Sequence, residues 1–183
     1  MQDNIYWSVV QFQDWNVLVA ATDQGLCFVG SNNGSFSELE QWGNRCFSSP
    51  LFTENDYLLQ PYARELKNYL QGKLTEFTIP TWYKGTAFQE EVWQALTTIP
   101  YGQTYSYSQI ADSIGKPNAV RAVGAAIGAN PLLITIPCHR VIGKNGALTG
   151  YRGGIEMKTK LLHIEQILHS HTASEQWNSS ELT

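Results

Sequence analysis

The hydrophobic pattern of this chain changes near residue 80, and no other feature constrains the fold as strongly. Before that point, short β-prone runs at 5–12, 15–20 and 26–29 are separated by Asp, Asn and Gly turn residues. After it, apolar residues recur at three- and four-residue intervals, as on one face of a helix. Two periodicities within 183 residues predict two small domains, because sheets and helices bury their apolar faces differently.

The first predicted domain, residues 1–80, is α/β. Helices are expected at 36–47 and at 56–71, where apolar residues recur at helical spacing until Gly72. The segment 74–79 is expected to return as a strand. No motif that carries chemistry occurs in this part of the chain, so we interpret it as a scaffold.

The second predicted domain, residues 86–169, is mainly helical. A helix is expected to begin at Thr86, a short one to occupy 107–114, and a third to be opened by Pro117, where a missing N–H is tolerated. Short helices joined by a glycine-containing turn are typical of a helix-turn-helix motif, and a generic helical hairpin fits the pattern equally well. Residues 170–183 are a predicted polar tail.

The third predicted helix has two very different faces. Val120, Val123 and Ile127 fall on one apolar stripe at about 100° per residue. Small side chains on the other face would let another surface approach closely, and a single arginine suits a groove or an extrahelical gap. A helix packed on both sides would use the same small residues, so both interpretations stay open. The residues of this second face are Arg121, Ala122, Ala125, Gly128 and Ala129.

Cys138 is the candidate nucleophile. It follows a β-prone run at 132–136 and Pro137, so it is expected where a strand gives way to a turn. A thiol attacks as the thiolate, and at a free pKa of about 8.5 only a small fraction is ionised near neutrality. His139 could accept the proton, through a bend or a bridging water because adjacent residues rarely face the same way. A structural cysteine is the alternative.

Glu165 is a third residue of interest. The chain from Ile155 onward is expected to be helical, and Glu165 falls on its apolar arc between Leu161 and Leu162. A carboxylate buried there needs a partner. It could orient His139 and stabilise its protonated form, which would complete a Cys–His–Glu relay. Alternatively it is an edge glutamate paired with Lys158 or another nearby base.

Charge is distributed unevenly along the chain. The stretch 84–160 has eight basic and four acidic residues, whereas the remainder has four basic and twelve acidic residues. A locally basic region on a globally acidic protein can bind DNA, with an affinity that falls quickly as salt is added. Uneven surface charge without a function explains the counts equally well.

Cysteine spacing and hydropathy bear on the compartment. Cys27, Cys46 and Cys138 are odd in number and far apart, which disfavours a disulfide framework and a Cys-x-x-Cys metal site. The N-terminus lacks the basic start and apolar stretch of a secretory signal, and no apolar run approaches the length of a membrane span. We therefore expect a cytoplasmic protein that binds no metal.

Four segments, taken together, carry a family resemblance. They are 121–126 (RAVGAA), 128–131 (GANP), 136–141 (IPCHRV) and 150–154 (GYRGG). In order and spacing the chain resembles the O6-alkylguanine-DNA alkyltransferases over about residues 86–165, and the Pro-Cys-His-Arg segment in this context is highly specific. The resemblance implies an α/β, ribonuclease H-like N-terminal domain and a mainly helical, DNA-binding C-terminal domain with a helix-turn-helix-like motif.

The resemblance also implies a chemistry. Cys138 would accept the alkyl group of O6-alkylguanine permanently, His139 would act as a base through water, and Glu165 would orient the histidine. Asn130 would hold the turn between the DNA-binding helix and the cysteine loop. The transfer would be irreversible, would occur once per molecule and would need no cofactor. Repair of O4-alkylthymine stays open.

A double-stranded DNA partner, bound from the minor-groove side, is implied as well. Tyr107 would donate to the departing guanine and assist rotation of the nucleotide, and Arg121 would occupy the space left by the extruded base. The residues around Tyr151 and Arg152 would line the guanine pocket. The small residues that would approach the floor of the minor groove are Ala122, Ala125 and Ala129.

Two other functions fit the same residues. A DNA-binding sensor would use the helix pair without chemistry, and Cys138 would then be dispensable. A cysteine hydrolase would use Cys138, His139 and Glu165 on an acyl substrate and would turn over repeatedly. The alkyltransferase itself is expected to be a monomer without a metal site or a membrane partner.

Overall fold

The first half of the chain forms a four-stranded sheet. A computed structural model describes the backbone of residues 3–178 and the side chains of residues 3–166. Strands β1 (Asp3–Phe12), β2 (Trp15–Thr22) and β3 (Gly25–Asn32) form an antiparallel meander, and β4 (Pro50–Glu54) pairs in parallel with β1. The strand order is therefore β3-β2-β1-β4.

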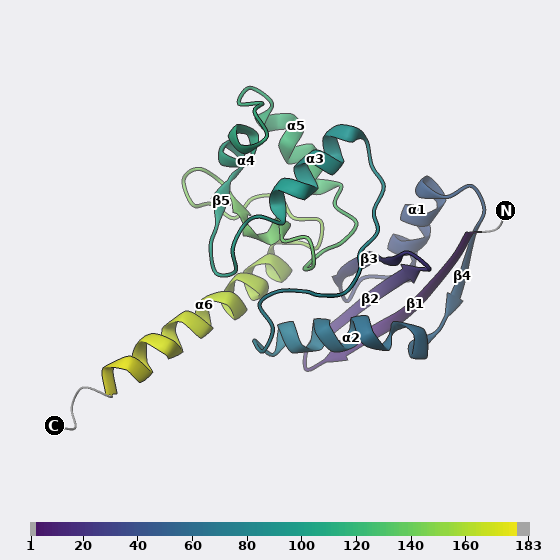
Figure 1. The fold of residues 1–183 in the computed structure, drawn as a ribbon, viewed down its shortest axis with the longest axis horizontal. Helices are drawn as coiled ribbons and strands as arrows, with labels where there is room; N and C mark the ends of the chain where they lie inside the picture. Colours follow the sequence, from purple (N-terminus) through teal and green to yellow (C-terminus); the bar gives the residue numbers. More distant parts are fainter. Residues whose placement is uncertain (1–2, 179–183) are drawn as a thin grey trace.

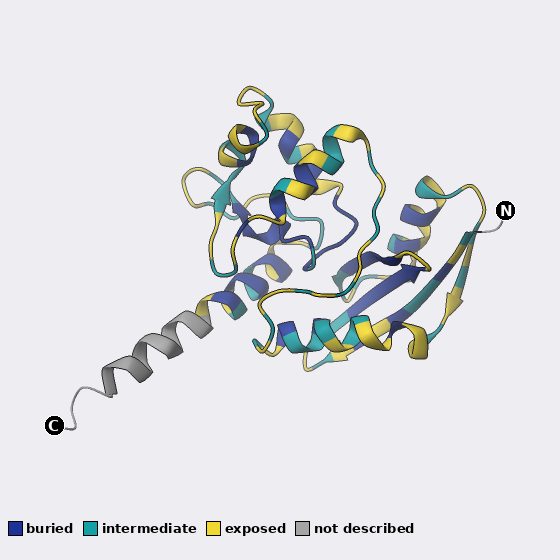
Figure 2. Cartoon of the chain, viewed as in Figure 1, coloured by how far each residue is buried: buried dark blue, intermediate teal, exposed yellow. Residues whose placement is uncertain are grey.

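One helix covers each face of this sheet (Figure 1). Val17 and Val19 of β2 belong to the cluster that includes Leu59 and Leu66 of α2 (Asp56–Leu70). The alternating residues of β2 pack instead against α1 (Phe36–Cys46) on the other face. Both faces of β2 are buried because side chains of a strand alternate in direction, and Figure 2 shows this strand almost wholly buried.

The second half of the chain is mainly helical. Its elements are α3 (Ala87–Leu96), β5 (Tyr105–Ser106), α4 (Tyr107–Ser113), α5 (Val120–Gly128), a short 3-10 helix at Cys138–Arg140, β6 (Val141–Ile142) and α6 (Ile155–Asn178). Capping boxes begin α3 at Thr86 and α4 at Ser106, which satisfies N–H groups that a helix start leaves free. Helices α4 and α5 pack together, joined by a turn through Gly115, as in a helix-turn-helix. The predicted α/β and mainly helical halves are both confirmed.

The two halves are joined along the outer edge of β3. Leu26 exchanges backbone hydrogen bonds with Pro80 and Trp82, and the amide of Val29 donates to the carbonyl of Pro131. These contacts cover the edge of the sheet, which would otherwise expose unpaired backbone groups. A single hydrophobic cluster continues from the sheet and α2 into α3, α5 and the beginning of α6. The N-terminal domain is therefore packed firmly against the region around Cys138.

Four sequence-based expectations about secondary structure were wrong or incomplete. Residues 74–79 form no strand, and this edge of β3 carries single bridges to Thr81 and Leu132 instead. The run 132–136 forms turns instead of a strand, and β4 was not anticipated. Pro117 lies in a turn before α5 and does not open that helix, whose N-cap is Ala119.

The C-terminal helix α6 is longer than the sequence suggested. Helix α6 continues through Asn178, so the predicted polar tail at 170–183 overlaps it, and residues 179–183 lie outside the described residues. None of the helices within residues 3–178 combines the length and the apolar character needed to cross a bilayer.

Candidate active site and DNA-facing helix

Asn130 organises the turn that leads to Cys138. The side chain is fully buried directly after α5, and its Oδ1 accepts a hydrogen bond from the amide of Leu132 at 2.9 Å. Its Nδ2 donates to the carbonyl of Ile136 at 3.2 Å and to Cys138 Sγ at 3.1 Å. One amide side chain thus closes the turn and reaches the sulfur, which brings Asn130 and Cys138 together in space.

The same turn stores backbone strain. Ile134 has a φ of 69°, in the left-handed region that β-branched residues rarely adopt. Such a conformation costs about 1–3 kcal/mol and persists only where surrounding contacts enforce it. The bonds of Asn130 and the buried side chain of Ile134, which is 1% exposed, supply that enforcement. The turn therefore holds the sulfur in a defined position.

Cys138 is buried, with 2% of its surface exposed. Burial raises the pKa of this thiol above its ordinary value, and the Asn130 hydrogen bond and the charges of Arg152 and Lys158 oppose that rise only in part. The sulfur is therefore a protonated thiol in this structure. A base must take its proton before it can attack.

His139 and Glu165 form a buried pair. His139 Nε2 lies 2.8 Å from Glu165 Oε1, and the two side chains are 0% and 1% exposed. Burial lowers the pKa of His139, and the hydrogen bond and charge of Glu165 counteract it only in part. A neutral imidazole is thus available as a base. His139 Nδ1 and the Tyr151 hydroxyl are the two buried side-chain polar atoms without a hydrogen-bond partner in the described part of the chain.

Arg140 is the main counterion of Glu165. Its Nε lies 3.1 Å from both carboxylate oxygens, and its Nη2 lies 3.0 Å from Oε1. The amide of Gly102 donates to Oε2 at 2.9 Å. Burial alone would raise the pKa of Glu165, but the bonds from His139, Arg140 and Tyr69 outweigh it and hold that pKa at about 2. Glu165 is therefore ionised, and it does not pair with Lys158 as one alternative held.

A cavity of about 460 Å³ lies beside α5. Its lining includes Tyr107 of α4, Gly128 of α5, and Tyr151 and Arg152 from the loop before α6. Cys138 does not line it. Tyr151 lines this cavity, and burial and then the electrostatic influence of Cys138 raise its pKa well above the ordinary value.

Tyr107 and Gly153 shape this cavity. The Tyr107 hydroxyl donates to the carbonyl of Thr149 at 2.9 Å, which ties α4 to the loop on the far side. A Cβ at Gly153 would lie 2.8 Å from the ring of Tyr151, closer than real Cβ contacts come. Only glycine at this position lets the loop pack tightly enough to hold Tyr151 at the wall.

The outer face of α5 is as bare as the sequence predicted. Val123 and Ile127 are buried, and the small residues opposite them are exposed to solvent. The alternative, a helix packed on both sides, is wrong for this face. The exposed residues are Arg121, Ala122, Ala125, Gly128 and Ala129.

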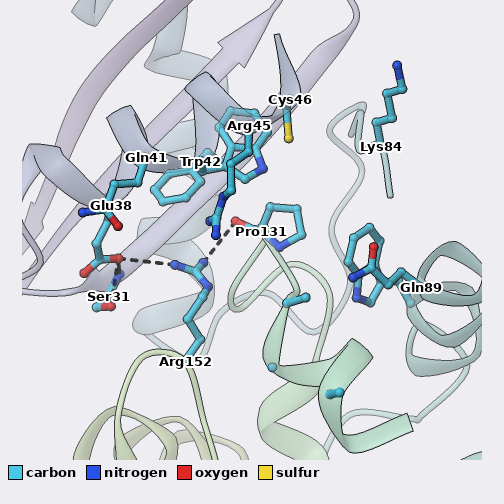
Figure 3. Close-up of a pocket in the computed structure, with 15 residues that line it drawn as sticks. Ser31, Glu38, Gln41, Trp42, Arg45, Cys46, Lys84, Gln89, Pro131 and Arg152 are labelled. Atoms are coloured by element: carbon cyan, nitrogen blue, oxygen red, sulfur yellow. Dashed lines mark hydrogen bonds and ion pairs between the residues drawn. The ribbon is translucent and has the colours of Figure 1, made fainter. Parts of the chain in front are cut away.

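Arg152 lies on the loop between this face and the N-terminal domain. Its Nε donates to the carbonyl of Asn130 at 2.9 Å, its Nη2 to that of Val29 at 2.6 Å, and its Nη1 lies 3.3 Å from Glu38 of α1. Figure 3 shows the guanidinium directed toward Glu38 and Pro131, at a groove of about 720 Å³ between α1 and α5. The guanidinium therefore joins the two domains, while the residue lines the 460 Å³ cavity as well.

Three residues near the site were missed or interpreted differently from the sequence. Tyr69 of α2 has helical spacing typical of a core residue, yet its hydroxyl reaches Glu165. Arg140 was noticed only within a motif. Lys158 is fully buried and donates to the carbonyls of Val141 and Thr149. Helical spacing places Lys158 one turn before Leu161 and Leu162, which was the available signal that it is buried. Within the described residues no group of three His, Cys, Asp or Glu side chains could hold a metal ion.

Comparison with known proteins gives a consistent answer. Residues 5–83 match the family model of the 6-O-methylguanine DNA methyltransferase ribonuclease-like domain, and residues 87–167 match that of the DNA-binding domain. A methylated-DNA–protein-cysteine methyltransferase, inducible, of Bacillus subtilis is 60% identical over 88% of this chain and 90% of its own length.

Solved structures agree with the sequence matches. A variant of the Mycobacterium tuberculosis O6-methylguanine methyltransferase is 38% identical, with a TM-score of 0.76, over 88% of this chain and 93% of that one. A Mycobacterium tuberculosis OGT in complex with DNA is also 38% identical, with a TM-score of 0.73, and the match covers 90% of this chain and 93% of that one. The fold, the matched domains and these identities show that this chain belongs to the 6-O-methylguanine DNA methyltransferase family.

Proposed function

We propose that this chain repairs double-stranded DNA by moving the alkyl group of O6-alkylguanine onto Cys138, once per molecule. The observation that carries the proposal is the placement of the Cys138 thiol. Asn130 Nδ2 donates to the sulfur at 3.1 Å, and the buried His139, which pairs with Glu165, follows it directly in the chain. Tyr151, whose pKa Cys138 influences, lines the cavity beside α5. Two relatives support the proposal. The Bacillus subtilis protein is named a methylated-DNA–protein-cysteine methyltransferase, and the Mycobacterium tuberculosis OGT structure is a complex with DNA.

The proposed reaction begins with a neutral thiol and a neutral imidazole. The proton of Cys138 passes to His139 Nδ1, the nitrogen without a partner, directly or through one water. The ionised Glu165 stabilises the imidazolium that forms. The sulfur then attacks the alkyl carbon in line, the C–O bond breaks with its electrons on guanine, and guanine takes up the proton that His139 gives back, directly or through water. A thioether remains on Cys138.

The lesion reaches the sulfur by leaving the duplex. In this proposal the exposed residues Ala122, Ala125 and Ala129 approach the floor of the minor groove, and Arg121 fills the gap in the base stack. Base flipping costs a few kcal/mol, less for a damaged pair. The base would enter the cavity between Tyr107 and Tyr151, where the Tyr107 hydroxyl exchanges the Thr149 carbonyl for the departing guanine.

The experiment is a stoichiometry measurement with duplex DNA that carries O6-methylguanine labelled in its methyl group. We expect no more than one labelled methyl per protein, with guanine restored in the DNA. Cys138→Ser should abolish transfer, and Cys46→Ser, a matched control at a half-buried thiol, should leave it intact. Many turnovers per protein would favour the hydrolase alternative, and lesion binding without any transfer would favour the sensor.

Several further features belong to the same proposal. Each proposed step uses residues of one chain, so a monomer is sufficient for the reaction. The proposed steps call on no metal or cofactor, and we propose the cytoplasm as the compartment. The proposed domains are residues 1–80 and 86–169. Sedimentation of the free protein tests the monomer, and a sedimenting dimer would contradict it.

A further inference from the structure

Tyr69 brings the N-terminal domain into the chemistry of the C-terminal one. It lies at the end of α2, fully buried, and its hydroxyl donates to Glu165 Oε1 at 2.5 Å. The same hydroxyl lies 3.1 Å from His139 Nε2. Its ring also packs edge-on against Tyr101 and against the imidazole of His139. A residue from the scaffold domain therefore contacts both members of the buried pair.

The number of available donors assigns the tautomer of His139. Burial and then the charge of Glu165 raise the pKa of Tyr69 well above its ordinary value, so its hydroxyl is neutral and has a single proton. That proton lies in the short bond to the ionised Glu165. The hydroxyl can therefore only accept from His139 Nε2, and the ionised Glu165 oxygen 2.8 Å from the same nitrogen can only accept as well, so both contacts require the proton at Nε2. The lone pair of the neutral imidazole is then at Nδ1, on the side of the ring that can serve Cys138.

We propose that Tyr69 is a positioning residue for the alkyl transfer, which fixes His139 as the Nε2-protonated tautomer and moderates the charge that Glu165 presents to it. The inference rests on the proposed function, because it gives His139 the role of base. It adds that the N-terminal domain completes the active site and is not only a scaffold.

The inference predicts the direction of a pH effect. The charged and titratable groups that face His139 are Glu165, Arg140, Lys158 and Tyr69 itself, with Tyr101 packed against Tyr69. Replacement of Tyr69 by Phe removes one donor from Glu165 and leaves Arg140 and Lys158 unchanged. Glu165 then attracts the imidazole proton more strongly, and loss of this 2.5 Å bond to a carboxylate outweighs loss of the 3.1 Å acceptor at His139 Nε2, so the pKa of His139 rises. The acid limb of the rate profile should move to higher pH.

The experiment compares Tyr69→Phe with Tyr62→Phe in the full chain. Tyr62 lies on the same helix but lines a different cavity, with Tyr6 and Thr22. The single-turnover rate of methyl transfer from duplex O6-methylguanine is measured across a pH series. We expect Tyr69→Phe to lower the plateau rate by about tenfold or more, as loss of positioning does, and to shift the acid limb upward. Tyr62→Phe should follow the wild type.

A second measurement needs no variant. NMR of the wild-type protein with nitrogen-labelled histidine should show His139 protonated at Nε2 and unprotonated at Nδ1. The opposite tautomer would overturn the inference, and so would a Tyr69→Phe profile with an unmoved acid limb. If the wild type itself transfers no methyl group, the proposed function fails, whereas an NMR titration of His139 in the wild type and in Tyr69→Phe still decides the role of Tyr69, because the pKa of His139 should be higher in the variant.

Discussion

Replacement of Glu165 by Gln is the sharpest test of the buried charge network. The carboxylate accepts from Arg140, the Gly102 amide, the Tyr69 hydroxyl and His139 Nε2. Glutamine keeps one oxygen and turns an amide NH2 group toward donors, while the Arg140 guanidinium stays buried without a counterion. Breaking a buried ion pair from one side costs about 3–5 kcal/mol. That is a large part of the roughly 5–15 kcal/mol by which domains are typically stable.

The lowered pKa of Glu165 gives a second value for the contribution of its carboxylate to the free energy of unfolding. A carboxyl whose pKa falls from 4.5 in the unfolded chain to about 2 in the folded one contributes about 3 kcal/mol. Because the folded pKa is the lower one, this stability is fully present above pH 4.5 and is lost as the pH falls toward 2. The glutamine variant has no such titration. The stability difference between wild type and variant should therefore narrow once the pH drops below about 4.5.

Urea unfolding, monitored by tryptophan fluorescence between about pH 7 and pH 3, measures both the stability cost of Glu165→Gln and its change with pH. Burial lowers the pKa of His139, so stability also falls below about pH 6.5, and this fall is larger in the variant because Glu165 no longer opposes that lowering. The two proteins are therefore compared below about pH 4.5, where Glu165 itself titrates. Glu156→Gln on the same helix is the control, since Glu156 is exposed and pairs with Lys160 at the surface. A cost below about 1 kcal/mol for Glu165→Gln, or a difference that stays constant with pH, would refute this reasoning.

Three further predictions concern the cysteine turn and α5. Asn130→Ala should cost about 1–3 kcal/mol in urea unfolding, because the buried Leu132 amide loses its partner; an unchanged midpoint would contradict this. Ala125→Leu should leave the unfolding midpoint unchanged but weaken duplex binding by about tenfold, or about 1.4 kcal/mol, in fluorescence anisotropy. Arg121→Ala should slow transfer from duplex DNA and not from the free alkylated base; equal slowing of both would argue against a role in base extrusion.

The local patterns of the sequence were sufficient for much of the fold. Helical spacing placed α2 and the buried stripe of α5, because side-chain direction in a helix repeats over a few residues. The strand predicted at 132–136 from its β-prone composition was wrong, because these mostly buried apolar residues lie in turns. Burial favours such residues whatever their backbone conformation, and the bond pattern of Asn130 that bends this segment is not visible as a periodicity.

Contacts between distant segments explain what the sequence did not reveal about the site. Glu165 was selected because a carboxylate on an apolar helix face needs a partner, and the pairing with His139 was one of two alternatives. Tyr69 has the spacing of a core residue, and only the apposition of α2 and α6 shows that its hydroxyl is used. The raised pKa of Cys138 follows from the burial of its side chain, which no local motif encodes.

Peptide mass spectrometry after reaction with O6-methylguanine duplex DNA tests the central claim most directly. The chain has three thiols, and Cys27 and Cys46 are internal controls in the same molecule. The account predicts the added methyl group on the peptide that contains Cys138 and on neither other cysteine. A methyl group on Cys27 or Cys46, or repaired DNA with all three thiols unmodified, would contradict it.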